Sequence, residues 1–132
     1  MQDSEKKALS QVRIDHAQEC LKAAEQLLDA GIYKSAANRS YYAVFHAMRA
    51  VLALDGIDKR KHSGIISEFR RLYIKTGIFD EEMSQIISEL FDIRSDSDYD
   101  DFFVISKEEV IEQVANAKCF LSVVCEYLSQ RS

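Results

Sequence analysis

The sequence predicts an all-α protein, an up-and-down bundle of five helices that forms one domain over residues 1–132. Three observations support this prediction. Apolar residues recur at spacings of three and four, the period of one helix face. There is no proline, and three of the four glycines directly follow apolar segments, where a helix is expected to end. Most connections are short, which favours antiparallel packing of successive helices.

Five segments carry this pattern, and we expect helices over residues 4–30, 33–55, 62–76, 80–95 and 106–128. The first three end at Gly31, Gly56 and Gly77. The fifth opens with Ser106-Lys-Glu-Glu109, a capping box in which the serine and glutamate side chains satisfy free backbone amides. Its apolar residues then follow a strict 4,3 repeat, as expected for a helix that packs along its whole length.

The apolar runs and the N-terminus bear on location. The longest apolar runs are far too short to cross a bilayer. The segment MQDSEKKALS is charged and lacks the apolar core of a signal peptide. We therefore expect a soluble, cytoplasmic protein.

The cysteines and histidines do not predict a metal or a cofactor. Cys20, Cys119 and Cys125 are odd in number and lack CxxC spacing, so they are expected to be reduced thiols. No cluster of histidine and cysteine at zinc-ligand spacing occurs along the chain.

Charge is unevenly distributed. The chain has 17 basic and 22 acidic residues, a net charge of −5, which argues against sequence-independent coating of nucleic acid. Residues 58–75 nevertheless have a net charge of +4, and residues 80–101 a net charge of −8. These segments are either two solvated faces or, for residues 58–75, a phosphate-binding patch.

The stretch NRSYYAVFHAMR places polar chemistry in a helix that is otherwise apolar or small. At 100° per residue, four of its side chains share one stripe, namely Arg39, Tyr42, His46 and Arg49. Such a helix is central to a fold, so the stripe is expected to face a cleft or a subunit interface. Its side chains either bond to carboxylates of neighbouring helices, for example in residues 89–101, or line a site for a phosphate or nucleotide.

The segments AANRSYYAVFHAMRAVL, KHSGIISEFRRLYIKTG and LFDIRSDSDYD together resemble the HEPN superfamily, particularly its small stand-alone prokaryotic members. The most specific parts are Asn38-Arg39 with Tyr41-Tyr42, Lys61-His62-Ser63, and Arg94 with Asp98-Tyr99. The resemblance implies a bundle of four or five helices that forms a homodimer. Many such proteins are paired with a minimal nucleotidyltransferase in toxin-antitoxin modules, and others are metal-independent ribonucleases or nucleotide-binding modules.

The ribonucleases of this superfamily carry an arginine followed, after four to six residues, by a histidine. Arg94 matches this arginine, but the next seven residues, SDSDYDD, contain no histidine. Tyr99 stands in its place, and a tyrosine of pKa about 10 is a poor base at neutral pH. The candidate catalytic residues are therefore Arg94, Tyr99 and His46. The candidate nucleotide- or RNA-binding residues are Arg39, Tyr42, His46, Arg49, Lys61, His62 and Arg94.

Three functional hypotheses follow. The first is a nucleotide- or RNA-binding HEPN partner of a nucleotidyltransferase, in a toxin-antitoxin-like module, without full ribonuclease activity. The second is a metal-independent ribonuclease in which Arg94 acts with His46 or His62 from another helix. The third is a purely structural dimerisation module.

Overall fold

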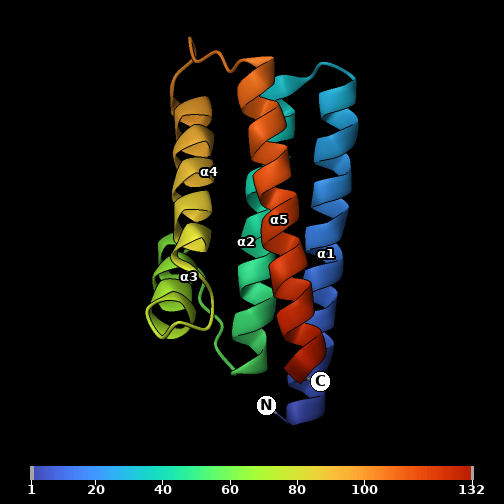
Figure 1. Ribbon diagram of the computed structural model, residues 1–132, viewed down its shortest axis with the longest axis vertical. Helices are drawn as coiled ribbons and strands as arrows, with labels where there is room; N and C mark the ends of the chain where they lie inside the picture. The colour runs from blue at the N-terminus through green and yellow to red at the C-terminus, as the bar shows by residue number, and fades with distance from the viewer. Residues whose placement is uncertain (1, 132) are drawn as a thin grey trace.

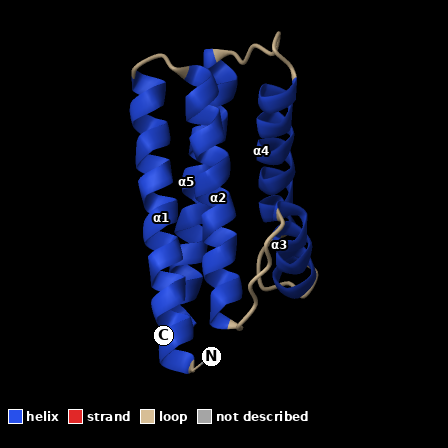
Figure 2. Ribbon diagram, turned by 180° about the vertical axis from the view of Figure 1, so that it is seen from behind, coloured by secondary structure: helices blue, strands red, loops and turns tan. Residues whose placement is uncertain are grey.

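The computed structural model describes residues 2–131, and this part of the chain is all-helical (Figures 1 and 2). Its elements are α1 (Asp3–Asp29), α2 (Tyr33–Leu54), α3 (His62–Phe69), the π-helical turn η1 (Arg70–Ile74), α4 (Glu81–Tyr99) and α5 (Lys107–Arg131). The four long helices run alternately up and down, and the short α3 lies on the α4 side of the bundle, away from α1 (Figure 1). The predicted all-α class with five helices is confirmed.

The helix ends follow local chemistry. Gly31, Gly56 and Gly77 all have positive φ, between 72° and 83°, a conformation that other residues rarely adopt. At the start of α5, the backbone N–H of Glu109 donates to Ser106 Oγ at 3.1 Å, as the capping-box pattern predicts. The terminating glycines and this cap therefore lie where the sequence placed them.

Two boundaries differ from the prediction. The third helix, expected to be continuous over 62–76, leaves α-helical geometry after Phe69, and the amide of Lys75 donates to Arg70 O at 2.9 Å, an i to i+5 bond. The fourth helix was expected to stop at residue 95, where serine and aspartate begin to alternate. It continues to Tyr99 because Arg94 and Asp98 form an i,i+4 ion pair of 3.3 Å across that turn.

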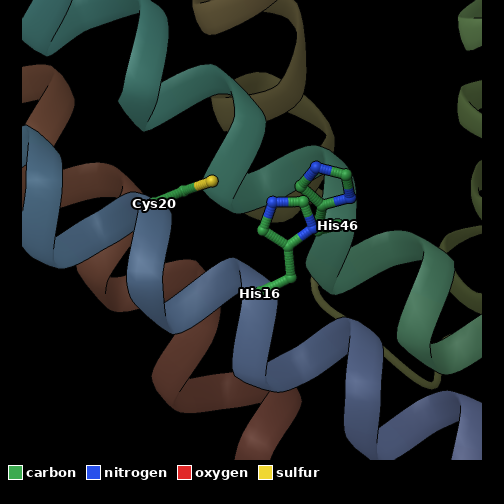
Figure 3. A group of neighbouring side chains, drawn as sticks. All are labelled: His16, Cys20 and His46. Atoms are coloured by element: carbon green, nitrogen blue, oxygen red, sulfur yellow. The ribbon is translucent and has the colours of Figure 1, made fainter.

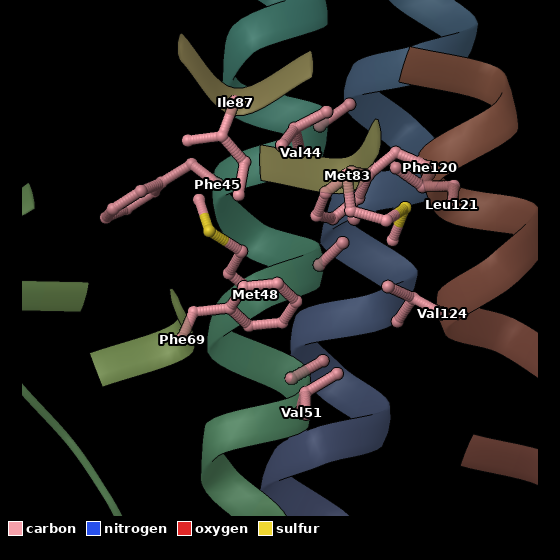
Figure 4. Packing of buried hydrophobic residues seen from close by; sticks show 14 of the residues in the cluster. Val44, Phe45, Met48, Val51, Phe69, Met83, Ile87, Phe120, Leu121 and Val124 are labelled. Atoms are coloured by element: carbon pink, nitrogen blue, oxygen red, sulfur yellow. The ribbon is translucent and has the colours of Figure 1, made fainter. Parts of the chain in front are cut away.

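α2 is the central helix of the bundle. It packs most extensively on α1, and also on α5, α4 and α3. Its small residues allow α1 to approach closely, and Ser10 Oγ of α1 donates to Ala50 O of α2 at 2.7 Å. The other side of α2 contributes to the hydrophobic core in Figure 4. The labelled core residues are Val44, Phe45, Met48 and Val51 of α2, Phe69 of α3, Met83 and Ile87 of α4, and Phe120, Leu121 and Val124 of α5. The polar stripe of α2 is thereby held in a fixed position.

The C-terminal end of α5 is tied to the end of α2 through Asp55. Arg131 Nη2 donates to Asp55 Oδ1 at 3.0 Å, and the hydroxyl of Tyr73, in η1, also donates to this carboxylate. Burial and the adjacent carboxylate raise the pKa of Tyr73, so it stays a protonated donor. Within residues 2–131, no helix combines the length and the apolar character needed to cross a bilayer.

Candidate nucleotide- or RNA-binding site

The polar stripe of α2 lies between α1 and α4, the two helices that flank α2 in Figure 2. On one side the ring of His46 stacks on His16 of α1, with ring centroids 4.0 Å apart. On the other side the guanidinium of Arg94, from α4, lies 5.3 Å above the ring of Tyr42. The stripe residues are half-buried, so they face neighbouring elements and not open solvent, as their spacing predicted.

Arg94 and His62 meet on the α4 side of the stripe, although they come from different helices. His62 is the first residue of α3, and its Nδ1 lies 3.5 Å from Arg94 Nη1 and 2.8 Å from the hydroxyl of Tyr41. The second functional hypothesis required Arg94 to meet a histidine from another helix. The structure supplies that histidine as His62, whereas His46 packs against α1.

Aromatic rings hold this pair in place. The His62 imidazole stacks on Phe45 with centroids 4.0 Å apart and planes 18° from parallel, and its neighbour Tyr42 presents an edge at 5.9 Å. Arg94 lies 5.1 Å above the ring of Tyr41 as well as over Tyr42. Cation–π contacts of this kind contribute about 0.5–2 kcal/mol each and orient the guanidinium. Arg39 covers Tyr42 at 5.4 Å and extends the cationic surface.

The contacts of His62 fix its tautomer. Arg94 Nη1, which can only donate, lies 3.5 Å from Nδ1, so a proton on Nδ1 would face another donor; the single lone pair of Nδ1 therefore accepts one bond, from Tyr41 at 2.8 Å. Burial raises the pKa of Tyr41 to about 12, which keeps its proton in place. Burial, followed by the charges of Arg94 and Arg49, lowers the pKa of His62, so its ring is neutral at pH 7. We therefore assign the ring proton to Nε2, which can donate to an incoming acceptor.

Some buried polar atoms at or near the stripe lack hydrogen-bond partners. Among the described residues, four buried side-chain nitrogen or oxygen atoms have none: His46 Nδ1, Arg49 Nε, Arg94 Nε and Gln113 Oε1. Three of these four belong to residues selected from the sequence as ligand-binding candidates. Asp98 Oδ2 lies 3.3 Å from Arg94 Nε as an ion pair, but outside hydrogen-bonding geometry. An unpaired buried donor costs about 1–3 kcal/mol, so Arg49 Nε and Arg94 Nε carry a cost to stability.

Carboxylates neutralise part of this positive charge. Asp98 pairs with Arg94, and Asp58, in the loop after α2, lies 3.0 Å from Arg13 and 3.6 Å from Arg49. Among the described residues, Arg49 is the one stripe residue with an ion pair, and its partner Asp58 lies in a loop, whereas Asp98 of the acidic segment pairs with Arg94 on its own helix. Within residues 2–131, Arg39 has no ion-pair partner, whereas Arg94 Nη1 already faces His62 Nδ1.

The remaining candidates lie away from this centre. Tyr99 is 87% exposed, and five residues along α4 place it about 140° around the helix from Arg94. Tyr99 therefore does not share the face on which Arg94 meets His62. Lys61 is exposed and directly precedes α3, one residue before His62.

The basic segment 58–75 borders a separate hollow of about 560 Å³, whose lining includes Arg70, Arg71, Lys75 and Ser88. Two of these cations already have partners. Arg70 donates to Ser84 Oγ at 2.9 Å and to Ser88 Oγ at 2.6 Å. Arg71 donates to Glu68 at 2.9 Å. Phosphate binding by this segment would therefore rest mainly on Lys75 and the outer face of Arg71.

The comparisons with known proteins agree with this architecture. The family described as HEPN domain matches residues 10–128 of the chain. The chain belongs to the HEPN family. Two relatives from Methanocaldococcus jannaschii are named "Putative toxin MJ0142" and "Putative toxin MJ0605". The first is 33% identical over a match that covers 90% of this chain and 81% of the relative. The second is 34% identical over a match that covers 67% of this chain and 66% of the relative. A UPF0332 protein of Thermotoga maritima is 34% identical over 82% of both chains.

Sequence reasoning missed three residues that the HEPN fold brings to the other side of the stripe. His16 and Cys20 of α1 lie against His46, and Arg13 joins Arg49 at Asp58. The spacing His16-x-x-x-Cys20 places both side chains on one face of α1 and was the available signal. It could not be interpreted alone, because the third member comes from α2.

Proposed function

We propose that this HEPN chain is a toxin-like module that binds phosphate groups of a nucleotide or RNA at Arg94 and His62, without full ribonuclease activity. It would act in the cytoplasm as a homodimer, beside a nucleotidyltransferase partner. The toxin names of the two Methanocaldococcus relatives support the general role. The binding chemistry rests on the site itself.

The observation that carries the proposal is the convergence of donors around Arg94. Arg94 and the Nε2–H of His62 are donors held in place by rings, and Arg39 and Arg49 add positive charge on either side. Arginine presents a planar fork that matches phosphate oxygens. Tyr42 contacts the guanidinium groups of both Arg39 and Arg94 and so keeps the two cations close to each other.

Binding of a labelled short single-stranded RNA, and separately of ATP, tests the proposal by fluorescence anisotropy and competition. Arg94→Ala should weaken binding about 10- to 100-fold, as expected for loss of charge-assisted bonds worth about 1.5–3 kcal/mol. Lys118→Ala, at an exposed position of α5, removes the same charge away from the site and is the matched control. Equal losses in the two variants, or no binding by a folded wild-type protein, would contradict the proposal, and the latter would favour a structural dimerisation module.

The 3.5 Å approach of Arg94 to His62 favours one second candidate, a metal-independent ribonuclease. In that reaction a histidine exchanges a proton with the ribose or the leaving oxygen, which contributes about 10²- to 10⁴-fold. Here His62 Nδ1 already accepts a hydrogen bond from Tyr41, so it is not free to act as a base. The Nε2–H of a neutral imidazole is too weak an acid to protonate the leaving oxygen. We therefore expect negligible RNA cleavage in the presence of a chelator. Efficient cleavage that is lost in both Arg94→Ala and His62→Ala would establish the ribonuclease instead.

The partner is tested by co-expression of the chain with the product of the neighbouring gene, followed by affinity purification. Recovery of a nucleotidyltransferase at a fixed ratio supports the module. A neighbouring gene of unrelated type, or a nucleotidyltransferase that fails to co-purify, contradicts that part of the proposal and leaves the binding site to be judged separately.

A further inference from the structure

A second cluster lies on the α1 side of the stripe and is chemically different from the Arg94 site. It consists of His16 and Cys20 of α1 and His46 of α2 (Figure 3). One ligand atom of each residue lies within 4.8 Å of the others. In a tetrahedral site with bonds of about 2.0–2.3 Å, ligand atoms are about 3.3–3.7 Å apart. Side-chain rotations that move these atoms by about an ångström would therefore bring all three within bonding distance of one metal ion.

The sequence builds this cluster through helix geometry and close packing. His16 and Cys20 are four residues apart, so both side chains project from one face of α1. Ala17, between them, and Ala43 and Ala47 on α2 are fully buried, and such small side chains let the two helices approach closely. His46 is thereby held against His16, with ring planes 22° from parallel.

The donor atoms are available for ligation. Among the described residues, His46 Nδ1 is a buried nitrogen without a hydrogen-bond partner. Cys20 is a buried free thiol, not part of a disulfide. Burial raises the pKa of the Cys20 thiol, with Arg39 opposing that shift, so a metal ion would have to displace the thiol proton when it binds.

The donor set selects the class of metal. Two imidazole nitrogens and one thiolate suit zinc and similar transition metals, whereas calcium and magnesium require oxygen ligands. Arg13, Arg39 and Arg49 lie near the cluster; Asp58 pairs with Arg13 and Arg49 and offsets one of these three charges, and a thiolate at Cys20 would offset one more. His16 is exposed, which provides an entry path and leaves a fourth coordination position open to solvent.

We propose that His16, Cys20 and His46 form a mononuclear transition-metal site of the zinc class that links α1 to α2. The site shares no residue with the Arg94–His62 pair. The result of the metal-binding test is therefore independent of the result for the proposed phosphate site.

Cobalt(II) titration of the full-length, chelator-stripped protein tests this site, because tetrahedral cobalt has strong visible bands and a thiolate ligand adds a charge-transfer band. The wild type should bind one equivalent with both signals, and zinc should displace the cobalt. His16→Ala, at an exposed position, should weaken binding at least 10-fold. Cys20→Ser should remove the charge-transfer band. Cys119→Ser, which changes an exposed cysteine on α5, should behave as the wild type.

Thermal unfolding with and without zinc gives a second readout. Zinc should raise the Tm of the wild type and leave that of His16→Ala unchanged. A wild-type spectrum without tetrahedral bands, a band lost in Cys119→Ser, or an unchanged affinity in His16→Ala would overturn the proposal. If Cys20→Ser does not fold, His16→Ala still decides, because the exposed His16 does not contribute to the core.

Discussion

Tyr41 connects the core to the candidate site, and Tyr41→Phe is the most informative single change to that connection. The ring is only 1% exposed, and its hydroxyl donates to His62 Nδ1 at 2.8 Å. Phenylalanine keeps the ring and its contact with Arg94, but removes the donor that fixes His62. The change therefore tests the orientation and tautomer of His62 without opening a cavity.

The expected magnitude follows from one lost hydrogen bond. A neutral hydrogen bond contributes about 0.5–1.5 kcal/mol net to the free energy of unfolding. For a chain of 132 residues this corresponds to a fall in Tm of about 2–5 °C. RNA affinity should fall about fivefold, because a loss of about 1 kcal/mol in the orientation of His62 has that effect on a dissociation constant.

Long-range ¹H–¹⁵N NMR of the imidazole at pH 7 reads the tautomer directly. The wild type should show His62 with its proton on Nε2, and Tyr41→Phe should shift the ring toward a mixture of tautomers. Tyr127→Phe is the matched control, because the Tyr127 hydroxyl accepts a bond of 3.0 Å from Arg131 far from His62. It should lower the Tm similarly and leave both the His62 spectrum and RNA affinity unchanged. A wild-type ring with its proton on Nδ1 would refute the assignment.

Three further predictions concern stability, association and charge. The hydrogen bonds from Arg131 and Tyr73 outweigh burial and lower the pKa of Asp55. The contribution of Asp55 to stability is therefore present above the ordinary carboxyl pKa of about 4 and is lost at lower pH. Between pH 5 and 3 the Tm of Asp55→Asn should fall less steeply than that of the wild type, and parallel curves would contradict this. Sedimentation at micromolar concentration should give a dimer, and a monomer would contradict the proposed homodimer. Reversing Arg71 and Lys75 to glutamate should weaken RNA binding and flatten its salt dependence, whereas unchanged binding would make residues 70–75 a solvated face.

Local sequence rules predicted the fold well because the ends and the buried face of each helix are encoded within its own segment. Gly31, Gly56 and Gly77 supply the left-handed residues that end helices, and apolar periodicity gives the packing faces. The extension of α4 to Tyr99 was missed because serine and aspartate are weak helix formers. The Arg94–Asp98 ion pair that supports this turn depends on side-chain geometry more than on composition.

The candidate site was only half predictable. The stripe of α2 follows from helical spacing on a single element, so its position between other helices could be expected. The approach of His62 to Arg94 depends on how the loop after α2 places the start of α3 against α4, and the residues are 32 positions apart. The grouping of His16 and Cys20 with His46 similarly requires the packing of α1 on α2, which no spacing within one helix reveals.

A double-mutant cycle between Arg94 and His62 tests the central claim most directly. RNA dissociation constants are measured for the wild type, Arg94→Ala, His62→Ala and the double variant, each confirmed as folded by circular dichroism. If the two side chains bind the same phosphate, the effects of the two substitutions on the binding free energy are not additive. The coupling free energy should then be about 1 kcal/mol or more. Additive effects, with a coupling near zero, would show that Arg94 and His62 act independently and would contradict a shared phosphate site.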